Sequence, residues 1–146
     1  MSKVFTKQIG KLYTSNPHGL NSLISETEVW QITRSGNLRP DAILVRELSP
    51  SLELFNTFIS KWKDKPPQTW WSFYEKRFLQ ELNSSEKLNS LRLLYKELSK
   101  GKNIVLVCFC SDHRYCHRRL VGEFMKNYGV EVEELNPINY EQIAMF

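Results

Sequence analysis

The chain has 146 residues, enough for one domain with a buried core, and its 41% hydrophobic and 25% charged residues are ordinary for a folded domain. The formal net charge of +4 favours an anionic partner, such as a nucleotide, a nucleic acid or a phosphorylated metabolite. No stretch approaches the roughly 18 apolar residues of a membrane span, and the first residues lack the apolar run of a secretory signal. The three cysteines cannot all pair within one chain, so we expect a cytoplasmic protein with no membrane contact.

The N-terminal part of the chain alternates strand patterns with turns. Residues 11–15 are typical of a short strand, and the turn sequence SNPHG follows them. Residues 19–26 can form two helical turns, and residues 28–33 have the alternation of a second strand. The apolar run at 41–48 is too short to decide between strand and helix.

Three helices are predicted in the middle of the chain. Ser49 and Pro50 have the residue types of an N-cap and a first helical position, which predicts a helix that continues through Trp62. The proline pair in residues 63–69 ends it. Apolar residues at helical spacing predict two further helices, and Gly101 is suited to cap the second. These apolar positions are Tyr74, Phe78 and Leu82, then Leu88, Leu91, Leu94, Tyr95 and Leu98.

The C-terminal part begins with NIVLVCFC at 103–110, the most continuous apolar run in the chain. A β-branched run without alternation is typical of a strand buried on both faces, so we expect the central strand here, parallel to residues 29–33. A helix with apolar residues from Leu120 to Tyr128 follows, Gly129 ends it, and residues 130–135 alternate as an outer strand. This order predicts a parallel crossover, and therefore a single three-layer α/β domain over the whole chain with a short, mainly parallel sheet.

Polar segments follow the three predicted parallel strands. In open α/β sheets, ligands bind beyond the carboxyl ends of the strands, where these segments meet. We therefore expect a ligand site formed by Ser15 after the first strand and by Arg34 and Arg39 after the second. The third segment, CFCSDHRYCHRR at 108–119, holds all three cysteines, two of the three histidines and Arg114.

A zinc site is one interpretation of this segment. Cys110, His113, Cys116 and His117 form a C-x2-H-x2-C-H pattern of zinc-ligand types. However, structural zinc sites usually draw two ligand pairs from separate segments, and no second pair exists here. Neighbouring helical residues also point about 100° apart. We therefore expect no metal cofactor.

A cysteine nucleophile is the second interpretation. Cys108 and Arg114 have the C-x5-R spacing of phosphate-binding loops, although the loop lacks the usual glycines. Cys116 lies in the predicted first turn of a helix, where the helix dipole and the neighbouring His117 and Arg118 favour a thiolate. The alternative for both cysteines is a buried, inert thiol, most of all for Cys108 at the end of an apolar strand.

An anion site at the helix start is the third interpretation. The first turn of a helix after a parallel strand offers free N–H groups and a positive dipole. Arg114 and Arg118 add charge-assisted donors, and His117 can donate a hydrogen bond or transfer a proton. Arg119, by contrast, is spaced to pair with Glu123 on the helix surface.

The stretches IVLVCFC, YCHRRLVGEFM and GVEVEEL together resemble domain-of-unknown-function family 488, whose hallmark is a strand that ends in a cysteine and a CHR sequence that opens a helix. LSPSLELF and WWSFYEKRFLQEL also resemble this family, and the resemblance covers most of residues 11–135. It implies a Rossmann-like fold and no established activity. The family residues carried onto this chain are Cys108, Cys116, His117, Arg118 and Tyr74, with Asp112 in the place of a family acidic residue.

We therefore expect a protein that binds or processes a nucleotide, a nucleic acid or another phosphorylated ligand, with Cys116, His117 and Arg118 as its working residues. Trp70, Trp71 and Tyr74 can stack on a base, but their helical spacing favours the core. Two alternatives stay open. One is a cysteine-dependent hydrolase or transferase acting on a small phosphorylated substrate, and the other is a noncatalytic interaction module whose cluster is structural.

Overall fold

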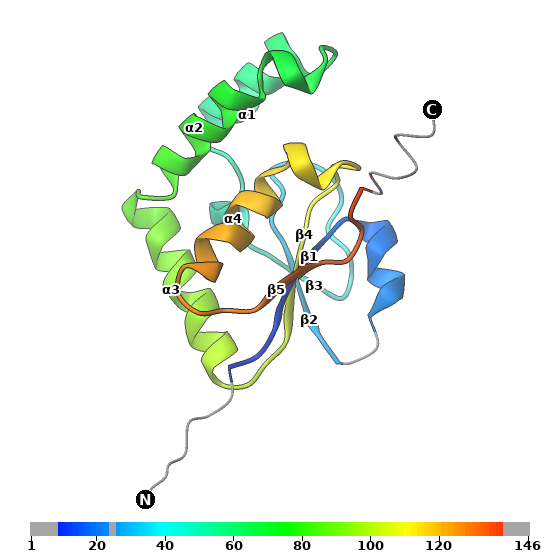
Figure 1. Cartoon of the computed structure of the whole chain (residues 1–146), viewed down its shortest axis with the longest axis vertical. Coiled ribbons are helices and arrows are strands. Elements are labelled where there is room, and N and C mark those ends of the chain that lie inside the picture. The colour runs from blue at the N-terminus through cyan, green and yellow to red at the C-terminus, as the bar shows by residue number, and fades with distance from the viewer. Residues whose placement is uncertain (1–8, 24–25, 139–146) are drawn as a thin grey trace, which may run out of the picture.

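Five parallel strands form one sheet in the order β3-β2-β4-β1-β5 (Figure 1). The computed structural model describes residues 9–23 and 26–138. Within them the strands are β1 (Leu12–Ser15), β2 (Glu28–Gln31), β3 (Ala42–Leu44), β4 (Ile104–Val107) and β5 (Val132–Glu134). Strand β4 is central and fully buried, as its continuous apolar sequence predicts. The expected α/β fold with a short parallel sheet is confirmed.

The helices of the described residues lie mostly on one side of the sheet (Figure 1). They are α1 (Leu52–Thr57) with a π-helical extension (Phe58–Trp62), α2 (Trp71–Glu81), α3 (Ser85–Ser99) and α4 (His117–Lys126). Short 3-10 helices occupy Pro17–Ser22, Arg46–Leu48, Pro67–Thr69 and His113–Tyr115. Across residues 9–23 and 26–138, we find no helix of the length and apolarity that a membrane crossing needs.

Two helix starts differ from the sequence prediction. The N-cap of α1 is Ser51, whose Oγ accepts a hydrogen bond from Leu54 N at 3.1 Å, and not Ser49. Ser49 instead ends the preceding 3-10 helix, and its Oγ donates to the carbonyl oxygen of Arg46, so this side chain does not cap α1. Near the N-terminus, the 3-10 helix starts already at Pro17, and residues 24–25 of the predicted turns lie outside the described part.

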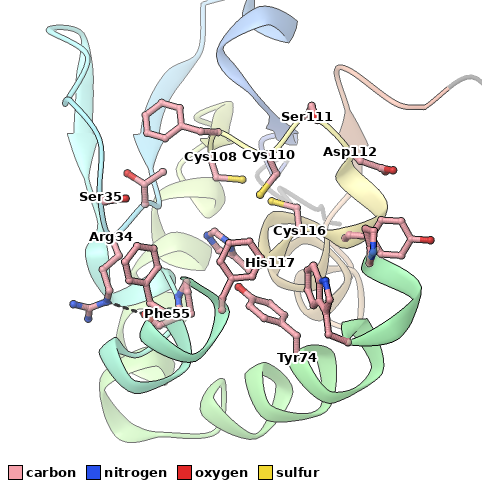
Figure 2. Close-up of a pocket in the computed structure, with 17 residues that line it drawn as sticks. Arg34, Ser35, Phe55, Tyr74, Cys108, Cys110, Ser111, Asp112, Cys116 and His117 are labelled. Carbon is pink, nitrogen blue, oxygen red and sulfur yellow. Dashed lines mark hydrogen bonds between the residues drawn. The ribbon is translucent and has the colours of Figure 1, made fainter. Parts of the chain in front are cut away.

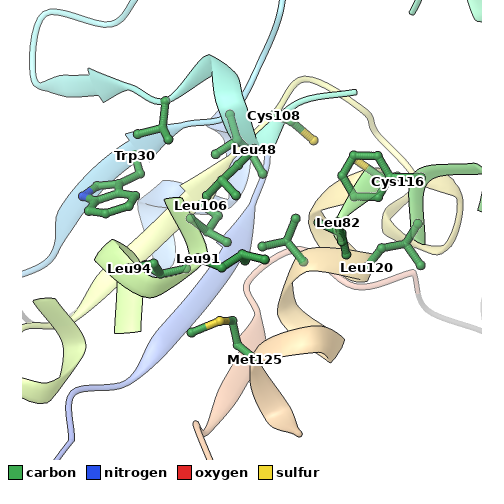
Figure 3. Packing of buried hydrophobic residues seen from close by; sticks show 14 of the residues in the cluster. Trp30, Leu48, Leu82, Leu91, Leu94, Leu106, Cys108, Cys116, Leu120 and Met125 are labelled. Carbon is green, nitrogen blue, oxygen red and sulfur yellow. The ribbon is translucent and has the colours of Figure 1, made fainter. Parts of the chain in front are cut away.

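The hydrophobic core lies mainly between the sheet and helices α2, α3 and α4 (Figure 3). Side chains of Ile104 and Leu106 enter it from β4, while the alternate Val105 and Val107 face the other side. There they meet a much smaller cluster that includes Leu20 of the first 3-10 helix. The third layer of this fold is therefore thin.

The strand order places a topological switch point between β2 and β4. From β2 the chain proceeds to β3 at one edge of the sheet, whereas from β4 it proceeds through α4 to β5 at the other edge. The two connections leave in opposite directions and open a crevice beyond the carboxyl ends of these strands. The segments that border this crevice are residues 32–35 and 108–117.

Replacing Leu94 in α3 should test the assignment of the core. Leu94 is fully buried, whereas its neighbour Leu93 on the same helix is 51% exposed. Leu94→Ala should lower the free energy of unfolding by roughly 2–5 kcal/mol, because it removes buried methyl groups and leaves a cavity. The matched control Leu93→Ala should change it by less than about 0.5 kcal/mol. Chemical denaturation of both variants measures the difference, and equal effects would contradict this core.

Candidate functional site

A cavity of about 340 Å³ opens at the switch point (Figure 2). The loop after β2 forms one side with Thr33, Arg34 and Ser35. The loop after β4 and the start of α4 supply the thiols of the site, and aromatic side chains from α1, its extension and α2 form the opposite wall. This pocket lies beyond the carboxyl ends of β2 and β4, where the sequence argument expected a ligand site.

All three cysteine side chains meet in this pocket (Figure 2). Cys108 directly follows β4, Cys110 lies two residues further, and Cys116 is the N-cap residue of α4. Their sulfur atoms lie within 4.8 Å of one another. Cys108 and Cys116 are buried at the base of the pocket, whereas Cys110 is exposed. A central strand and a helix start thus bring together thiols that are up to eight positions apart.

Arg118 lies directly behind these thiols and is fully buried. Its Nε and Nη2 donate to the Glu134 carboxylate at 2.9 and 3.2 Å, and its Nη1 donates to the Cys110 carbonyl at 2.8 Å. Nη1 also lies 3.4 Å from Cys108 Sγ and 3.6 Å from Cys116 Sγ. We expected Arg118 to contact a bound anion directly. The structure corrects this: the guanidinium clamps the chain's own groups and serves as the positive neighbour of two sulfur atoms.

The electrostatics favour a single thiolate, at Cys108. Burial opposes ionisation of Cys108, but hydrogen bonds from the Cys110 and Cys116 thiols and nearby positive charge, including Arg118, lower its pKa well below the usual range. The Cys108 hydrogen bond raises the pKa of Cys110, and burial raises that of Cys116. The three sulfur atoms lie within 4.8 Å of one another, so the thiols titrate as one coupled group.

His117 closes the base of the pocket beside Cys116 (Figure 2). Its Nε2 lies 2.6 Å from the carbonyl oxygen of Ile32. Because a carbonyl oxygen can only accept, Nε2 carries a proton, and Nδ1 is the remaining polar atom of the ring. The ring packs on Phe78, with 5.6 Å between the centroids. His117 is thus held in one orientation by the backbone that follows β2.

The aromatic wall of the pocket is continuous with the core. Trp70 and Tyr74 are buried, with ring centroids 5.8 Å apart and an edge-to-face angle of 67°. Phe58 lies 5.3 Å from Trp70, and Trp71 stacks on Tyr74 at 5.3 Å. Trp70 and Tyr74 pack in the core, as their helical spacing predicts. The same two residues also line the cavity.

The other predicted ligand residues divide into two groups. Arg34 and Asp112 line the pocket, and Asp112 forms an ion pair with Arg114 at 2.8 Å, which holds the pKa of Asp112 below its usual value. Ser15 and Arg39 are not among the lining residues, which corrects their prediction. Ser15 is buried and donates to the Asn16 carbonyl at 2.7 Å, while Arg39 pairs with a neighbouring aspartate on the surface.

Sequence reasoning missed two features of the site. It considered Cys110 only as a zinc ligand, and it did not identify Glu134 as a partner of Arg118. The strand pattern at 130–135 did carry a signal for Glu134, because a parallel outer strand must end near the same mouth as β4. The Arg118–Glu134 pair follows from that alignment, with β5 next to β1.

A metal-ligand set also differs from the sequence pattern. The thiols of Cys108, Cys110 and Cys116 converge. Among the described residues, these three side chains form a cluster of possible metal ligands, and thiolates suit a soft cation. The predicted set paired two cysteines with His113 and His117, and neither histidine belongs to this group. A cation among the thiols would lie close to the guanidinium of Arg118, which repels it.

A family model described as the active DUF488-N3 subclade matches residues 11–129. No curated protein and no solved structure matches the chain. The matched range runs from β1 to just beyond α4 and includes all three thiols, His117 and Arg118, whereas Glu134 lies outside it. The family resemblance inferred from the CHR sequence is confirmed.

Removing the guanidinium of Arg118 should destabilise the fold. Arg118→Ala leaves the Glu134 carboxylate without its buried partner, so we expect a loss of about 3–5 kcal/mol in the free energy of unfolding. Arg119→Ala is the matched control one position away, because Arg119 pairs with Glu123 and Glu75 near the surface. That variant should lose at most about 1 kcal/mol. Denaturant titration measures both, and a neutral Arg118→Ala would contradict the clamp.

The purified protein should contain less than one zinc per chain and should remain folded in chelator. The positive charge of Arg118 beside two of the three sulfur atoms is the reason. Elemental analysis and circular dichroism with and without chelator measure these properties. One equivalent of zinc, with loss of the fold on its removal, would show a structural metal centre instead.

Proposed function

This chain belongs to the DUF488 family, and we propose that it is a cysteine-dependent hydrolase or transferase with Cys108 as its nucleophile. The observation that carries the proposal is the meeting of three thiols and one buried guanidinium at the base of an open pocket. A thiolate is the reactive form of cysteine, and positive charge and thiol donors favour that form at Cys108. The description of the matched subclade as active agrees with it.

The neighbouring groups have the chemistry that a covalent mechanism needs. The Cys108 thiolate would attack an electrophilic carbon of the substrate, forming a carbon–sulfur bond while the leaving group departs with its bonding electrons. His117, whose Nε2–H is held by the Ile32 carbonyl, would supply a proton to that group from Nδ1. Water in a hydrolase, or an acceptor in a transferase, would then displace the sulfur and return the proton. The thiols of Cys116 and Cys110 would stabilise the Cys108 thiolate as hydrogen-bond donors, and the positive charge of Arg118 would stabilise it electrostatically.

Developing negative charge on the substrate would meet backbone donors in the same pocket. The N–H groups of residues 109–111 donate no hydrogen bond to other described residues. No side chain caps the start of α4 at Cys116, so the positive end of this helix also faces the cluster without a capping acceptor. This supports the part of the sequence-based hypothesis that placed anion stabilisation at the helix start.

The ligand in this proposal is a nucleotide or another phosphorylated molecule. The net charge of +4 favours an anion, and Arg34 lies at the pocket with its terminal nitrogens unused by the described residues. A cavity of about 340 Å³ suits one small molecule or a single nucleotide unit. Because a reactive thiolate survives only where thiols stay reduced, we place the protein in the cytoplasm.

Alkylation should distinguish this enzyme from a noncatalytic module. Iodoacetamide should react with buried Cys108 before exposed Cys110, since only the thiolate reacts and the pKa of Cys108 is lowered while that of Cys110 is raised. The Cys108 rate should rise with pH and level off below the range of a free cysteine, whose pKa is about 8.5. Peptide mapping by mass spectrometry at a series of pH values measures both rates.

The variant Cys108→Ser provides the control, because it should abolish the fast reaction at position 108, while Cys110 should react faster than in the unchanged protein, since it loses the Cys108 hydrogen bond that raises its pKa. Faster modification of Cys110 than of Cys108 in the unchanged protein would instead mean that exposure alone governs reactivity. The cluster would then be structural, and the noncatalytic module would be the better description.

A further inference from the structure

The hydroxyl of Tyr74 is a buried polar group without a partner in the described residues. Tyr74 is 6% exposed, lines the pocket and points into it toward His117 (Figure 2). No hydrogen bond of its hydroxyl to a described residue is found. Leaving such a group unsatisfied is destabilising, and native structures rarely tolerate it without a ligand or water partner.

The position of this hydroxyl is fixed by packing. The Tyr74 ring lies between Trp71, at 5.3 Å and 19°, and Phe78, at 6.3 Å and 10°. Trp70 contacts it edge-on. With parallel rings on both sides, the phenol cannot turn away from the cavity without breaking core contacts. It therefore presents one hydrogen-bonding group at a defined point of an otherwise aromatic wall.

The remaining wall of the pocket is suited to a flat ring. Phe55, Phe58 and Trp70 line it from the helical side, and Phe109 lines it from the loop after β4. The Phe109 ring is exposed and rests against Gly36, where a Cβ atom would collide with it. Gly36 also has a φ of +99°, which other residues rarely adopt. A glycine thus allows an aromatic ring to lie at the entrance of the pocket.

The charges of the pocket separate its base from its rim. At the base of the pocket, the guanidinium of Arg118 donates to the chain's own carboxylate and carbonyl groups, so it is not available to a phosphate. At the side of the pocket, away from the sulfur atoms, Arg34 donates through Nε to the Pro50 carbonyl at 2.9 Å (Figure 2). Its Nη groups have no acceptor among the described residues. A neutral group of the ligand therefore fits the bottom of the pocket, and an anionic group fits its rim.

We propose that the pocket binds a nucleoside or nucleotide with the nucleobase inside, its edge toward Tyr74 and the thiols, and the phosphate outside near Arg34. This assignment rests on the proposed function, since it places the ring, and not the phosphorus, next to Cys108. A nucleobase combines the flat apolar face that the aromatic wall accepts with edge donors and acceptors for the phenol of Tyr74 and Nδ1 of His117. The reacting atom is then an atom of the nucleobase or the sugar carbon to which the nucleobase is bonded.

Binding should be measured on Cys108→Ser, which prevents turnover and keeps the pocket. The probes are the common ribonucleosides and deoxyribonucleosides, their 5′-monophosphates, ribose 5-phosphate and inorganic phosphate. Isothermal titration and tryptophan fluorescence should detect at least one nucleoside, because its base would stack near Trp70. The monophosphate should bind more tightly, and Arg34→Ala should remove that gain. Neither ribose 5-phosphate nor inorganic phosphate should bind comparably.

Tyr74→Phe separates recognition of the base from folding. It should weaken nucleoside binding about tenfold, the effect of one lost hydrogen bond, without lowering stability, because the hydroxyl has no partner in the described protein. The matched control Tyr128→Phe, on the far end of α4, should leave binding unchanged. Binding of ribose 5-phosphate equal to that of the nucleotide, or no loss in Tyr74→Phe, would overturn the assignment. Slow alkylation of Cys108 together with normal nucleoside binding would instead refute only the nucleophile.

Discussion

The buried guanidinium of Arg118 is the group on which both the C-terminal fold and the site depend. It joins helix α4 to strand β5 through Glu134, and to the loop after β4 through the Cys110 carbonyl. A buried cation is tolerable only when acceptors surround it, and here a carboxylate, a carbonyl and two sulfur atoms do so. The same acceptors are thereby fixed around one positive charge, which links packing directly to thiol chemistry.

Periodicity alone was enough to predict most of the fold. The continuous run at 103–110 required a strand covered on both faces, and β4 is that strand. Gly101 and Gly129, expected to end helices, both have positive φ values, of 88° and 83°. The start of α1 was misplaced by two residues because Ser49 and Ser51 flank the same proline, and their tertiary partners distinguish them: Ser51 N donates to the Glu81 carboxylate at 2.8 Å, whereas Ser49 bonds to the preceding turn.

The site was predictable in location but not in the direction of its side chains. The rule of strand ends brought Arg34, Cys108, Cys116 and His117 to one pocket. It could not show that Arg118 turns inward, because that depends on the carboxylate of a strand sixteen positions later. Nor could helical spacing reveal Tyr74 as a pocket residue, since the same face of α2 serves the core and the cavity.

Strand β5 reaches the thiol cluster through a single residue. It is one of the two edge strands, paired on one side only, and its last residue, Glu134, supplies the carboxylate that orients Arg118. Edge elements open more readily than central ones. Each detachment of this short segment would free the guanidinium from its acceptor and alter the charge felt by Cys108. An edge strand and a buried sulfur atom are thus joined by one shared guanidinium.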